Sequence, residues 1–289
     1  MRIAHIITAH KNPAQLEKLI RAMYHPGFDF YIHLDKKISS ASFEYLREID
    51  GVCFVKDRTV CNWGGFSLVE AIMKSIEQIK QTGISYDFVN LISAQDYPLK
   101  PAAEIYDFFN EKKGCSFLSF DDSRDSLWWQ SAEKRYAVFH FTDMNFRGKY
   151  IVQAIANTLM SKRKFPAAME LYGGNKSCWW TISMEAAVYL ASYLRENPKM
   201  MNFLRLTWGC DEFIVATILM NSPFKDKIVN ENYRYIDWSA GLAHPKILLT
   251  EDHKGIINSG MLFGRKFDME IDSNIIDQLD AHILSGKVS

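Results

Sequence analysis

The chain has 289 residues, of which 48% are hydrophobic and 24% are charged, so it can bury the core of one large domain or two small ones. Its 34 Lys and Arg residues balance 34 Asp and Glu residues, which excludes a global field that attracts nucleic acid, and we expect no nucleic-acid partner. No apolar run is long enough for a membrane span.

Five cysteines, an odd number, are scattered along the sequence. They form no CxxC pair and no spacing typical of zinc ligands, so we expect reduced, mostly structural thiols. The first residues do not read as a secretory signal. Together these features predict a cytoplasmic protein, or one that lies peripherally at the inner face of a membrane.

Residues 2–122 alternate short apolar runs with helical patterns, which is typical of an α/β sheet with helices on its faces. The pair Asn12-Pro13 opens the first helix, because Pro suits the start of a helix. Strands are expected at 2–9, 28–35, 52–57, 88–93 and 116–122, and helices at 14–24 and 67–80.

The second half of the sequence has more helical patterns and fewer strands. Residues 144–176 are irregular except for a helix at 150–160 with basic residues on both sides. No repeat, low-complexity segment or linker rich in Gly, Ser or Pro divides the chain, so one domain is predicted. A strand is expected at 178–183, and helices are expected at 184–197, from about 211 to 220, and at 273–284.

Polar residues follow the ends of the first, second and fourth predicted strands. Ligands of open α/β sheets gather at the carboxyl ends of the strands, so these segments predict a binding crevice. Neither a GxxxxGKS/T phosphate loop nor a GxGxxG turn is present, which argues against a P-loop enzyme and a dinucleotide oxidoreductase. The segments are Ala9-His10-Lys11, Asp35-Lys36-Lys37 and SAQDYPLK at 93–100.

Two adjacent carboxylates, Asp211 and Glu212, stand directly before the apolar run 213–220. Such residues are either helix caps or groups held in a fixed place for chemistry. In the first turn of a buried helix, Glu212 would have a fixed position. The helix N-terminus favours its ionised form and burial disfavours it, so the sequence leaves the direction of its pKa shift open.

The sequence has no Asp-x-Asp at a strand end, a motif that can hold a divalent cation beside a diphosphate. The acidic segment SFDDSRDS at 119–126 is typical of a polar turn instead. Without a metal, basic side chains must neutralise a leaving diphosphate. Lys246, Arg265 and Lys266 are the candidates, although such residues more often form a solvated face.

Nine segments follow one another in order from about residue 3 to residue 268: ITAHKNPAQLEKLI, YIHLDKK, NWGGFSLVEA, NLISAQDYPLK, CWWTIS, CDEFIVATILMNSPF, RYIDW, HPKILLTEDH and SGMLFGRKFD. This series resembles the core-2/I-branching β-1,6-N-acetylglucosaminyltransferases and the peptide O-xylosyltransferases, in an anchorless, bacterial-type form. The most specific parts are WGG, QDYP, the acidic dipeptide before an apolar helix, and RKFD.

The resemblance implies an α/β fold of the GT-A type, a Rossmann-like nucleotide-sugar transferase with a mixed central sheet and helices on both faces. It implies a single glycosyltransferase domain over 1–289, with a nucleotide-binding half at about 1–122 and an acceptor-side and catalytic half at about 123–289. The implied reaction is an inverting, metal-independent transfer of GlcNAc or xylose from a UDP-sugar to a hydroxyl of a glycan, glycolipid or glycoprotein. The UDP-sugar is a co-substrate, and no cofactor or metal is expected.

The functional residues of the family carry over onto matching positions of this sequence. Glu212 matches the catalytic base, and Asp211 then serves as a helix cap. Asp35 and Lys37 look like contacts to uracil and ribose. The other donor-side candidates are Ala9 and His10 beside the nucleotide, Trp63 and Gly64 in the nucleotide wall, Asp96 near the donor sugar, and Lys246, Arg265 and Lys266 in a diphosphate clamp.

Aromatic rings that can stack on sugar faces are the candidates for acceptor binding. They are Trp128 and Trp129, which are expected in a loop, and Trp180 from a strand. The segment 123–175 does not match the family, so the acceptor stays open. The helix within 147–164 and its basic flanks predict either a solvated surface helix or a peripheral membrane contact.

Two other functions compete with sugar transfer. A catalytically silent nucleotide-sugar-binding protein would keep the fold, but binding alone needs no base opposite the leaving group. A glycosidase would use a carboxylate pair. However, Asp211 and Glu212 are sequence neighbours on a predicted helix and would point in different directions.

Overall fold

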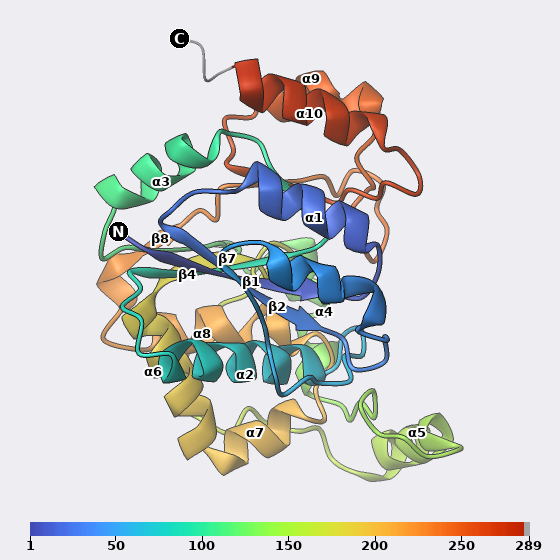
Figure 1. Ribbon diagram of the computed structural model, residues 1–289. Coiled ribbons are helices and arrows are strands. Elements are labelled where there is room, and N and C mark those ends of the chain that lie inside the picture. The colour runs from blue at the N-terminus through green and yellow to red at the C-terminus, as the bar shows by residue number, and fades with distance from the viewer. Residues whose placement is uncertain (286–289) are drawn as a thin grey trace.

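A seven-stranded mixed sheet lies at the centre of the computed structural model, which describes residues 1–285 (Figure 1). Its strands are β1 (Ile3–Ala9), β2 (Phe28–Leu34), β3 (Val52–Phe54), β4 (Phe88–Ser93), β6 (Ser116–Leu118), β7 (Trp180–Ser183) and β8 (Ile228–Asn230). The strand order is β3-β2-β1-β4-β7-β6-β8. The first four strands in this order are parallel, whereas β7 is antiparallel to both of its neighbours.

The strands predicted from the sequence are present, although β3 and β6 are only three residues long. The residues from Ile3 to Ile7 are all buried, as expected for a strand with neighbours on both sides and helices on both faces. In the sheet, Ala9 pairs with Leu34, and Thr8 pairs with Ser93. The polar segments that follow β1, β2 and β4 therefore begin at the same edge of the sheet.

Helices cover both faces of this sheet, which confirms the predicted fold class, a mixed central sheet with helices on both faces (Figure 1). No helix within residues 1–285 combines the length and the apolar character needed to cross a membrane. The α-helices are α1 (Pro13–Ala22), α2 (Ser67–Gln81), α3 (Ala102–Glu111), α4 (Leu127–Tyr136), α5 (Lys149–Leu159), α6 (Met184–Glu196), α7 (Pro198–Leu204), α8 (Ile214–Met220), α9 (His253–Ile257) and α10 (Asn274–Ser285). The 3₁₀ helices are η1 (Ala41–Glu48), η2 (Cys210–Glu212), η3 (Lys225–Lys227) and η4 (Thr250–Asp252).

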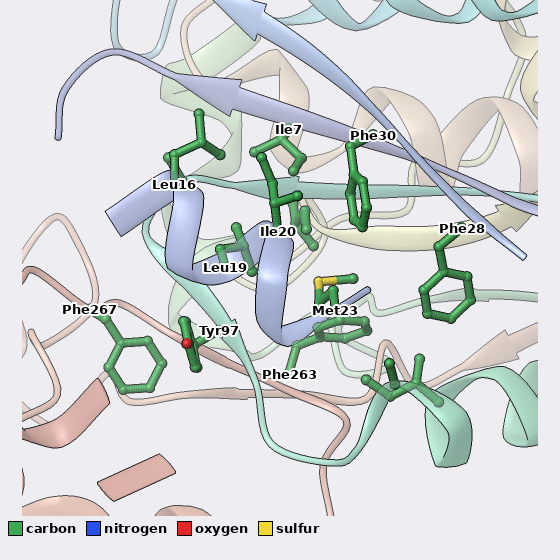
Figure 2. Close-up of a cluster of buried hydrophobic side chains, with 14 of the residues drawn as sticks. Ile7, Leu16, Leu19, Ile20, Met23, Phe28, Phe30, Tyr97, Phe263 and Phe267 are labelled. Atoms are coloured by element: carbon green, nitrogen blue, oxygen red, sulfur yellow. The ribbon is translucent and has the colours of Figure 1, made fainter. Parts of the chain in front are cut away.

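On one face, the hydrophobic core forms where α1 packs on the sheet. Figure 2 shows Leu16 and Ile20 of α1 on the side of the helix that faces Ile7 and Phe30 of the sheet. All four side chains are fully buried, and the apolar residues of α1 recur at helical spacing. This contact fixes α1 beside the carboxyl end of β1, where the polar segments gather.

On the other face, α2, α6 and α8 pack against the sheet. The core there includes Ile6 of β1, Ile72 of α2 and Ile218 of α8. It also includes Trp180 of β7, whose side chain is fully buried. Trp179, which precedes β7, is only partly buried and packs against the same core. Because Trp180 is fully buried, its predicted contact with an acceptor has no support in the structure.

A second, three-stranded sheet joins segments that are far apart in the sequence. Its order is β5 (Asp96–Pro98), β10 (Phe263–Arg265) and β9 (Arg234–Ile236). Strands β5 and β10 are antiparallel, and Arg265 lies opposite Asp96. Figure 2 shows Phe263 and Phe267, which flank Arg265 and Lys266 in the sequence, in the core beneath α1. Burial of these two rings fixes the basic pair between them.

The predicted helix from Asp211 to about residue 220 is interrupted. Asp211 and Glu212 belong to the 3₁₀ helix η2, and α8 begins only at Ile214. Phe213 separates the two, with φ of −144° and ψ of −25°, which is not helical. The N-cap residue of α8 is Phe213, and no side-chain hydrogen bond from the described part of the chain caps this helix there, so the prediction that Asp211 caps the apolar helix is wrong.

Trp128 and Trp129 lie in a helix, α4, and not in the predicted loop. Ser126 caps this helix by accepting a hydrogen bond from the backbone N–H of Trp129 at 3.3 Å. The two tryptophans are adjacent, so they do not show the helical spacing of apolar residues on which the sequence prediction depends.

Candidate active site

Charged residues predicted to bind the donor gather at the carboxyl edge of the central sheet. His10 follows β1, and partial desolvation together with the cations Lys11 and Lys266 lowers its pKa. Asp35, which follows β2, acts on the same ring in the opposite direction. Charges from the segments after β1, β2 and β10 thus act on the same ring. Ala9 is buried at the end of β1 and contributes its carbonyl oxygen to the backbone N–H of Asp35 at 2.9 Å.

Asp35 is buried at the end of β2 and joins two loops. Its Oδ1 accepts hydrogen bonds from the backbone N–H groups of Lys37 at 2.9 Å and Cys61 at 3.4 Å. Its Oδ2 lies 3.4 Å from Lys37 Nζ, which also donates to Cys61 O at 2.5 Å. The structure therefore holds Asp35 and Lys37 side by side, and their contacts to uracil and ribose stay a prediction.

The WGG segment that begins at Trp63 fits closely against another part of the chain. Gly64 has a φ of 71°, and a Cβ there would lie only 2.3 Å from Trp208 Nε1, so the position requires glycine. Asp143 fixes the segment by accepting from Ser67 N at 2.8 Å and Ser67 Oγ at 2.7 Å. The ring of Trp63 is 63% exposed and is available for the predicted nucleotide wall.

Arg265 and Asp96 form a buried pair between β10 and β5. Arg265 Nε lies 3.4 Å from Asp96 Oδ1, and the guanidinium carbon lies 3.7 Å from the ring centroid of Trp179. Burial raises the pKa of Asp96, against the effect of Arg265. Two buried nitrogens of Arg265, Nε and Nη1, have no hydrogen-bond partner within the described part of the chain. The guanidinium therefore keeps donors for an anion.

Lys266 lies next to this pair, on a loop that α1 holds in place. The buried side chain of Gln15 on α1 donates a hydrogen bond to Phe267 O at 3.1 Å. Desolvation and the cations Arg265 and Lys11 lower the pKa of Lys266. A bound anion would favour its charged form. The sequence analysis missed Gln15, because a polar residue in an amphipathic helix carries no sign of this role.

Lys246 does not join this group. Its Nζ lies 2.7 Å from Asp252 Oδ1 and 3.9 Å from Glu251 Oε1, both in η4. The hydrogen bond to Asp252 raises the pKa of Lys246. A diphosphate would have to compete with these carboxylates for Lys246, and the role of this residue in the clamp stays a prediction.

Glu212 is held through one of its two oxygens. Its Oε2 accepts a hydrogen bond from Trp128 Nε1 at 2.5 Å and lies 2.9 Å from Arg135 Nη1. The guanidinium carbon of Arg135 lies 4.7 Å from the ring centroid of Trp208. Among the hydrogen bonds between residues 1–285, none reaches Glu212 Oε1. One oxygen is therefore fixed, and the other can accept a proton.

The surroundings raise the pKa of both adjacent carboxyl groups. Burial raises the pKa of Glu212, and the charge of Arg135 opposes this effect. Burial and the charge of Glu212 raise the pKa of Asp211 to about 7. A carboxylate with a raised pKa is a stronger base than an ordinary exposed carboxylate, which suits proton abstraction near neutral pH.

A cavity of about 360 Å³ lies against Glu212. Its walls come from α4, from Asn175, from η2 and from loops that include Trp208 and Trp238. Trp128 lines it as well, although this ring is mostly buried and its N–H is bonded to Glu212. The sequence analysis did not single out Trp208 or Trp238 as rings that an acceptor could meet.

Trp129 points away from this cavity. The guanidinium carbon of Arg124 lies 3.8 Å from the centroid of the Trp129 ring, and Trp129 Nε1 donates to Asp121 O at 3.4 Å. Of the three tryptophans predicted to bind an acceptor, only Trp128 therefore reaches the cavity.

The partly buried thiol of Cys178 is influenced by both carboxylates and by Arg265. Burial and the charges of Asp211 and Glu212 raise the pKa of Cys178, and Arg265 acts in the opposite direction. A thiol with a raised pKa is a poor nucleophile, so Cys178 fits the expected structural role of the cysteines.

Within residues 1–285, no group of three or more His, Cys, Asp or Glu side chains could hold a metal ion. In the acidic segment at 119–126, Asp121 Oδ2 accepts from Ser126 Oγ at 2.6 Å, and Asp122 Oδ1 accepts from Asn230 Nδ2 at 2.9 Å. These contacts agree with the predicted polar turn. Metal-independent chemistry stays a prediction.

Relatives of this chain are named as xylosyltransferases. The chain is 25% identical over 307 residues to Xylosyltransferase 2 of Rattus norvegicus, with 98% of this chain and 34% of the relative covered. It is 24% identical over 305 residues to Xylosyltransferase 1 of Rattus norvegicus, with 98% of this chain and 35% of the relative covered. The chain thus spans about a third of the length of the curated relatives it matches.

Solved structures resemble the chain more remotely. Mouse xyloside xylosyltransferase 1 in its apo form has 10% identity and a TM-score of 0.41, with 91% of this chain and 96% of that chain covered. The apo-form glycosyltransferase GlyE of Streptococcus pneumoniae TIGR4 has 11% identity and a TM-score of 0.41, with 100% and 64% covered. These likenesses are too remote to assign a role to any residue.

The family model described as Core-2/I-Branching enzyme matches residues 3–254. This range contains the strand-end segments, the WGG segment, Asp96 and Glu212, and it ends before Arg265 and Lys266. The match confirms the resemblance predicted from the order of the sequence segments. The chain belongs to the Core-2/I-Branching enzyme family.

Proposed function

We propose that this protein is an inverting, metal-independent glycosyltransferase that moves a sugar from a UDP-sugar to a hydroxyl of a glycan, glycolipid or glycoprotein. In this reaction the acceptor oxygen attacks the anomeric carbon while the bond from that carbon to the UDP oxygen breaks. Glu212 takes the hydroxyl proton, and the electron pair of the broken bond leaves with UDP. The names of the relatives and the family support sugar transfer as the reaction class.

The position of Glu212 is the observation that carries this proposal. Trp128 and Arg135 bond only to Oε2, which fixes the side chain and leaves Oε1 for a proton. The cavity beside the carboxylate offers room for an acceptor group. A base must lie within about 2.6–3.2 Å of the hydroxyl oxygen, and a carboxylate fixed at the wall of a cavity can be approached to this distance by an acceptor.

The basic pair, Arg265 and Lys266, supports the proposal that UDP is the leaving group. A diphosphate gains negative charge as the glycosidic bond breaks, and fixed cations stabilise that charge without reorganisation. Arg265 Nη1 has no hydrogen-bond partner within the described part of the chain, and the pKa of Lys266 is lowered by desolvation and by the cations beside it. Both features favour binding of an anion. We propose that Arg265 and Lys266 contact the diphosphate, with no divalent cation required.

A catalytically silent nucleotide-sugar-binding protein would also need the basic pair, but it would not need a fixed, free carboxylate oxygen beside a cavity. A glycosidase would have no use for the basic pair at Arg265 and Lys266. The substitution Glu212→Gln separates these possibilities, because it preserves the shape of the side chain and removes its basicity.

The test compares wild type, Glu212→Gln and Glu111→Gln, an exposed control on α3, in buffer with EDTA. UDP release from UDP-xylose and from UDP-GlcNAc, with water or a sugar acceptor, reports transfer, and calorimetry with UDP reports donor binding. We expect Glu212→Gln to lose about 10²–10⁴-fold in kcat and to keep its affinity for UDP, and Glu111→Gln to match wild type. Equal turnover in all three would refute Glu212 as the base.

Two further results would contradict parts of this proposal. Activity that appears only with added Mn²⁺ or Mg²⁺ would overturn metal independence. UDP binding without turnover of either UDP-sugar in wild type, with a panel of sugar acceptors, would favour the silent binding protein. If turnover occurs, the ratio of kcat/KM values for the two donors decides between xylose and GlcNAc.

A further inference from the structure

The helix α5 has an unusual orientation on the molecule. It projects from the body at the lower right of Figure 1, away from the two layers of helices that cover the sheet. None of its residues is buried. Three apolar residues at helical spacing point outward: Ile151 is 69% exposed, Ile155 is 53% exposed and Leu159 is 79% exposed.

Polar residues of α5 fix this orientation. Gln153 Oε1 accepts from the backbone N–H of Phe141 at 2.8 Å. Asn157 Oδ1 accepts from Phe139 N at 2.7 Å, and its Nδ2 donates to Phe139 O at 2.9 Å. Lys149 Nζ donates to two carbonyl groups of the same preceding loop. Residues 149, 153 and 157 lie on one face of the helix, so the polar face points inward and the apolar face is held outward.

Basic residues surround the outward face. Residues 144–164 contain five Lys or Arg residues and no Asp or Glu, in a chain whose formal net charge is zero. Arg147 and Lys164 are exposed on either side of α5. Lys162 pairs with Glu133 at 2.8 Å, and Arg163 donates to backbone carbonyl groups, among them Val138 O at 3.0 Å, which anchors the segment to the body.

We propose that the outward face of α5, formed by Ile151, Ile155 and Leu159, inserts into the surface of a bilayer that contains anionic phospholipids. An exposed apolar helix face with a cationic rim has the chemistry of an interfacial helix, and the charge of the rim is complementary to anionic headgroups. A second copy of this chain is a poorer partner, because a symmetric contact would bring the two cationic rims together. The surface is separate from the cavity at Glu212.

The test uses the full-length purified chain in vesicle flotation, with vesicles of phosphatidylcholine alone and of phosphatidylcholine mixed with phosphatidylglycerol. We expect wild type to float with the anionic vesicles, and to bind phosphatidylcholine vesicles at least tenfold more weakly. The triple variant Ile151→Ser/Ile155→Ser/Leu159→Ser should lose at least tenfold in binding. The charge variant Arg147→Glu/Lys164→Glu should lose binding and become less sensitive to salt.

The matched control is Ile271→Ser/Leu284→Ser, which replaces two exposed apolar residues outside α5 and should bind as wild type does. Circular dichroism of each variant checks the fold, and the changed residues are all exposed. In addition, Tyr150→Trp places a fluorophore beside the outward face, and its emission should shift to the blue with anionic vesicles. Wild type that stays unbound, or a triple variant that floats as well as wild type, would overturn the proposal. So would a concentration-dependent dimer that the triple variant abolishes.

Discussion

The donor side of the candidate active site is built from strand ends, whereas the carboxylate side is built from the helix α4 and the short 3₁₀ helix η2. On the donor side, the paired strands β1, β2, β5 and β10 fix the backbone beside Asp35, Asp96 and Arg265. On the carboxylate side, Glu212 depends on side chains that are distant in the sequence, Trp128 and Arg135.

This difference teaches where the site is vulnerable to substitution. A residue at a strand end keeps its place through many backbone hydrogen bonds, so a change in one neighbouring side chain alters its charge environment more than its position. Glu212 has one ion pair and one side-chain hydrogen bond at its carboxylate, so a change in either partner alters both the charge and the position of the base. Substitutions on the donor side should therefore change mainly the charge environment of a site residue, whereas substitutions beside Glu212 should change both its charge environment and its position.

The largest effect is expected for Arg135→Met. Removing one partner of a mostly buried ion pair leaves Glu212 with an uncompensated charge and should lower the free energy of unfolding by about 3–5 kcal/mol. Since Arg135 opposes the rise in the pKa of Glu212, its loss should raise that pKa further. The acidic limb of the kcat profile should then move to higher pH, because the base must be ionised.

Urea unfolding and a pH–rate profile measure these two effects of Arg135→Met. Lys134→Met, at the neighbouring position of α4, is the control for loss of a cation without loss of the pair. A loss of stability with an unchanged pH–rate profile would show that Arg135 does not act on the base.

The next largest effect is expected at the contact between the two regions, where Gly64 of the donor side packs against Trp208 of the carboxylate side. An added Cβ would lie 2.3 Å from Trp208 Nε1, and the φ of 71° disfavours alanine. Gly64→Ala should therefore lower the free energy of unfolding by about 2–3 kcal/mol. Gly83→Ala is the control, because its φ is also 71° but its Cβ would meet nothing within 4 Å. Equal losses in the two variants would show that backbone strain alone is responsible.

The sequence predicted the donor side better than the carboxylate side for a physical reason. Strand ends can be located from short apolar runs, and parallel pairing brings them to one edge, as Asp35 and Asp96 illustrate. The partners of Glu212 lie in α4, where the adjacent tryptophans show no helical spacing. Their contacts with Glu212 are tertiary and leave no local pattern. For Lys246 the local sequence matches the family, but it does not reveal that the ammonium group pairs with carboxylates of η4 in the structure.

A smaller effect, on the affinity for UDP, distinguishes Lys266 from Lys246 in the predicted clamp. Lys266→Ala should weaken UDP binding about 10–100-fold, since a hydrogen bond to a charged group contributes about 1.5–3 kcal/mol. Lys246→Ala should change the affinity less than about twofold, because its ammonium is already paired with Asp252. Calorimetry with UDP in EDTA measures both variants. A larger loss for Lys246→Ala would mean that the loop at 239–246 rearranges when the nucleotide binds.

The last prediction concerns the pH dependence of stability at Asp211. Its pKa in the folded protein is raised from 3.8 to about 7, so between these values the folded state binds more protons than the unfolded state. Stability is therefore lost as the pH rises through this window. Asp211→Asn stays neutral and avoids this loss. The variant should be more stable than wild type at pH 8, with a much smaller difference at pH 4.

Urea unfolding of wild type and Asp211→Asn at pH 4 and pH 8 measures this difference. The exposed control Asp226→Asn should show no pH-dependent gain. If the gain of Asp211→Asn were the same at both pH values, proton binding at Asp211 would not be its cause. A gain confined to pH 8 would mean that the carboxylate side carries a stability cost in its ionised form. The donor side contrasts with it, because there desolvation and the cations Arg265 and Lys11 lower the pKa of Lys266, and a bound anion would favour the charged form of Lys266.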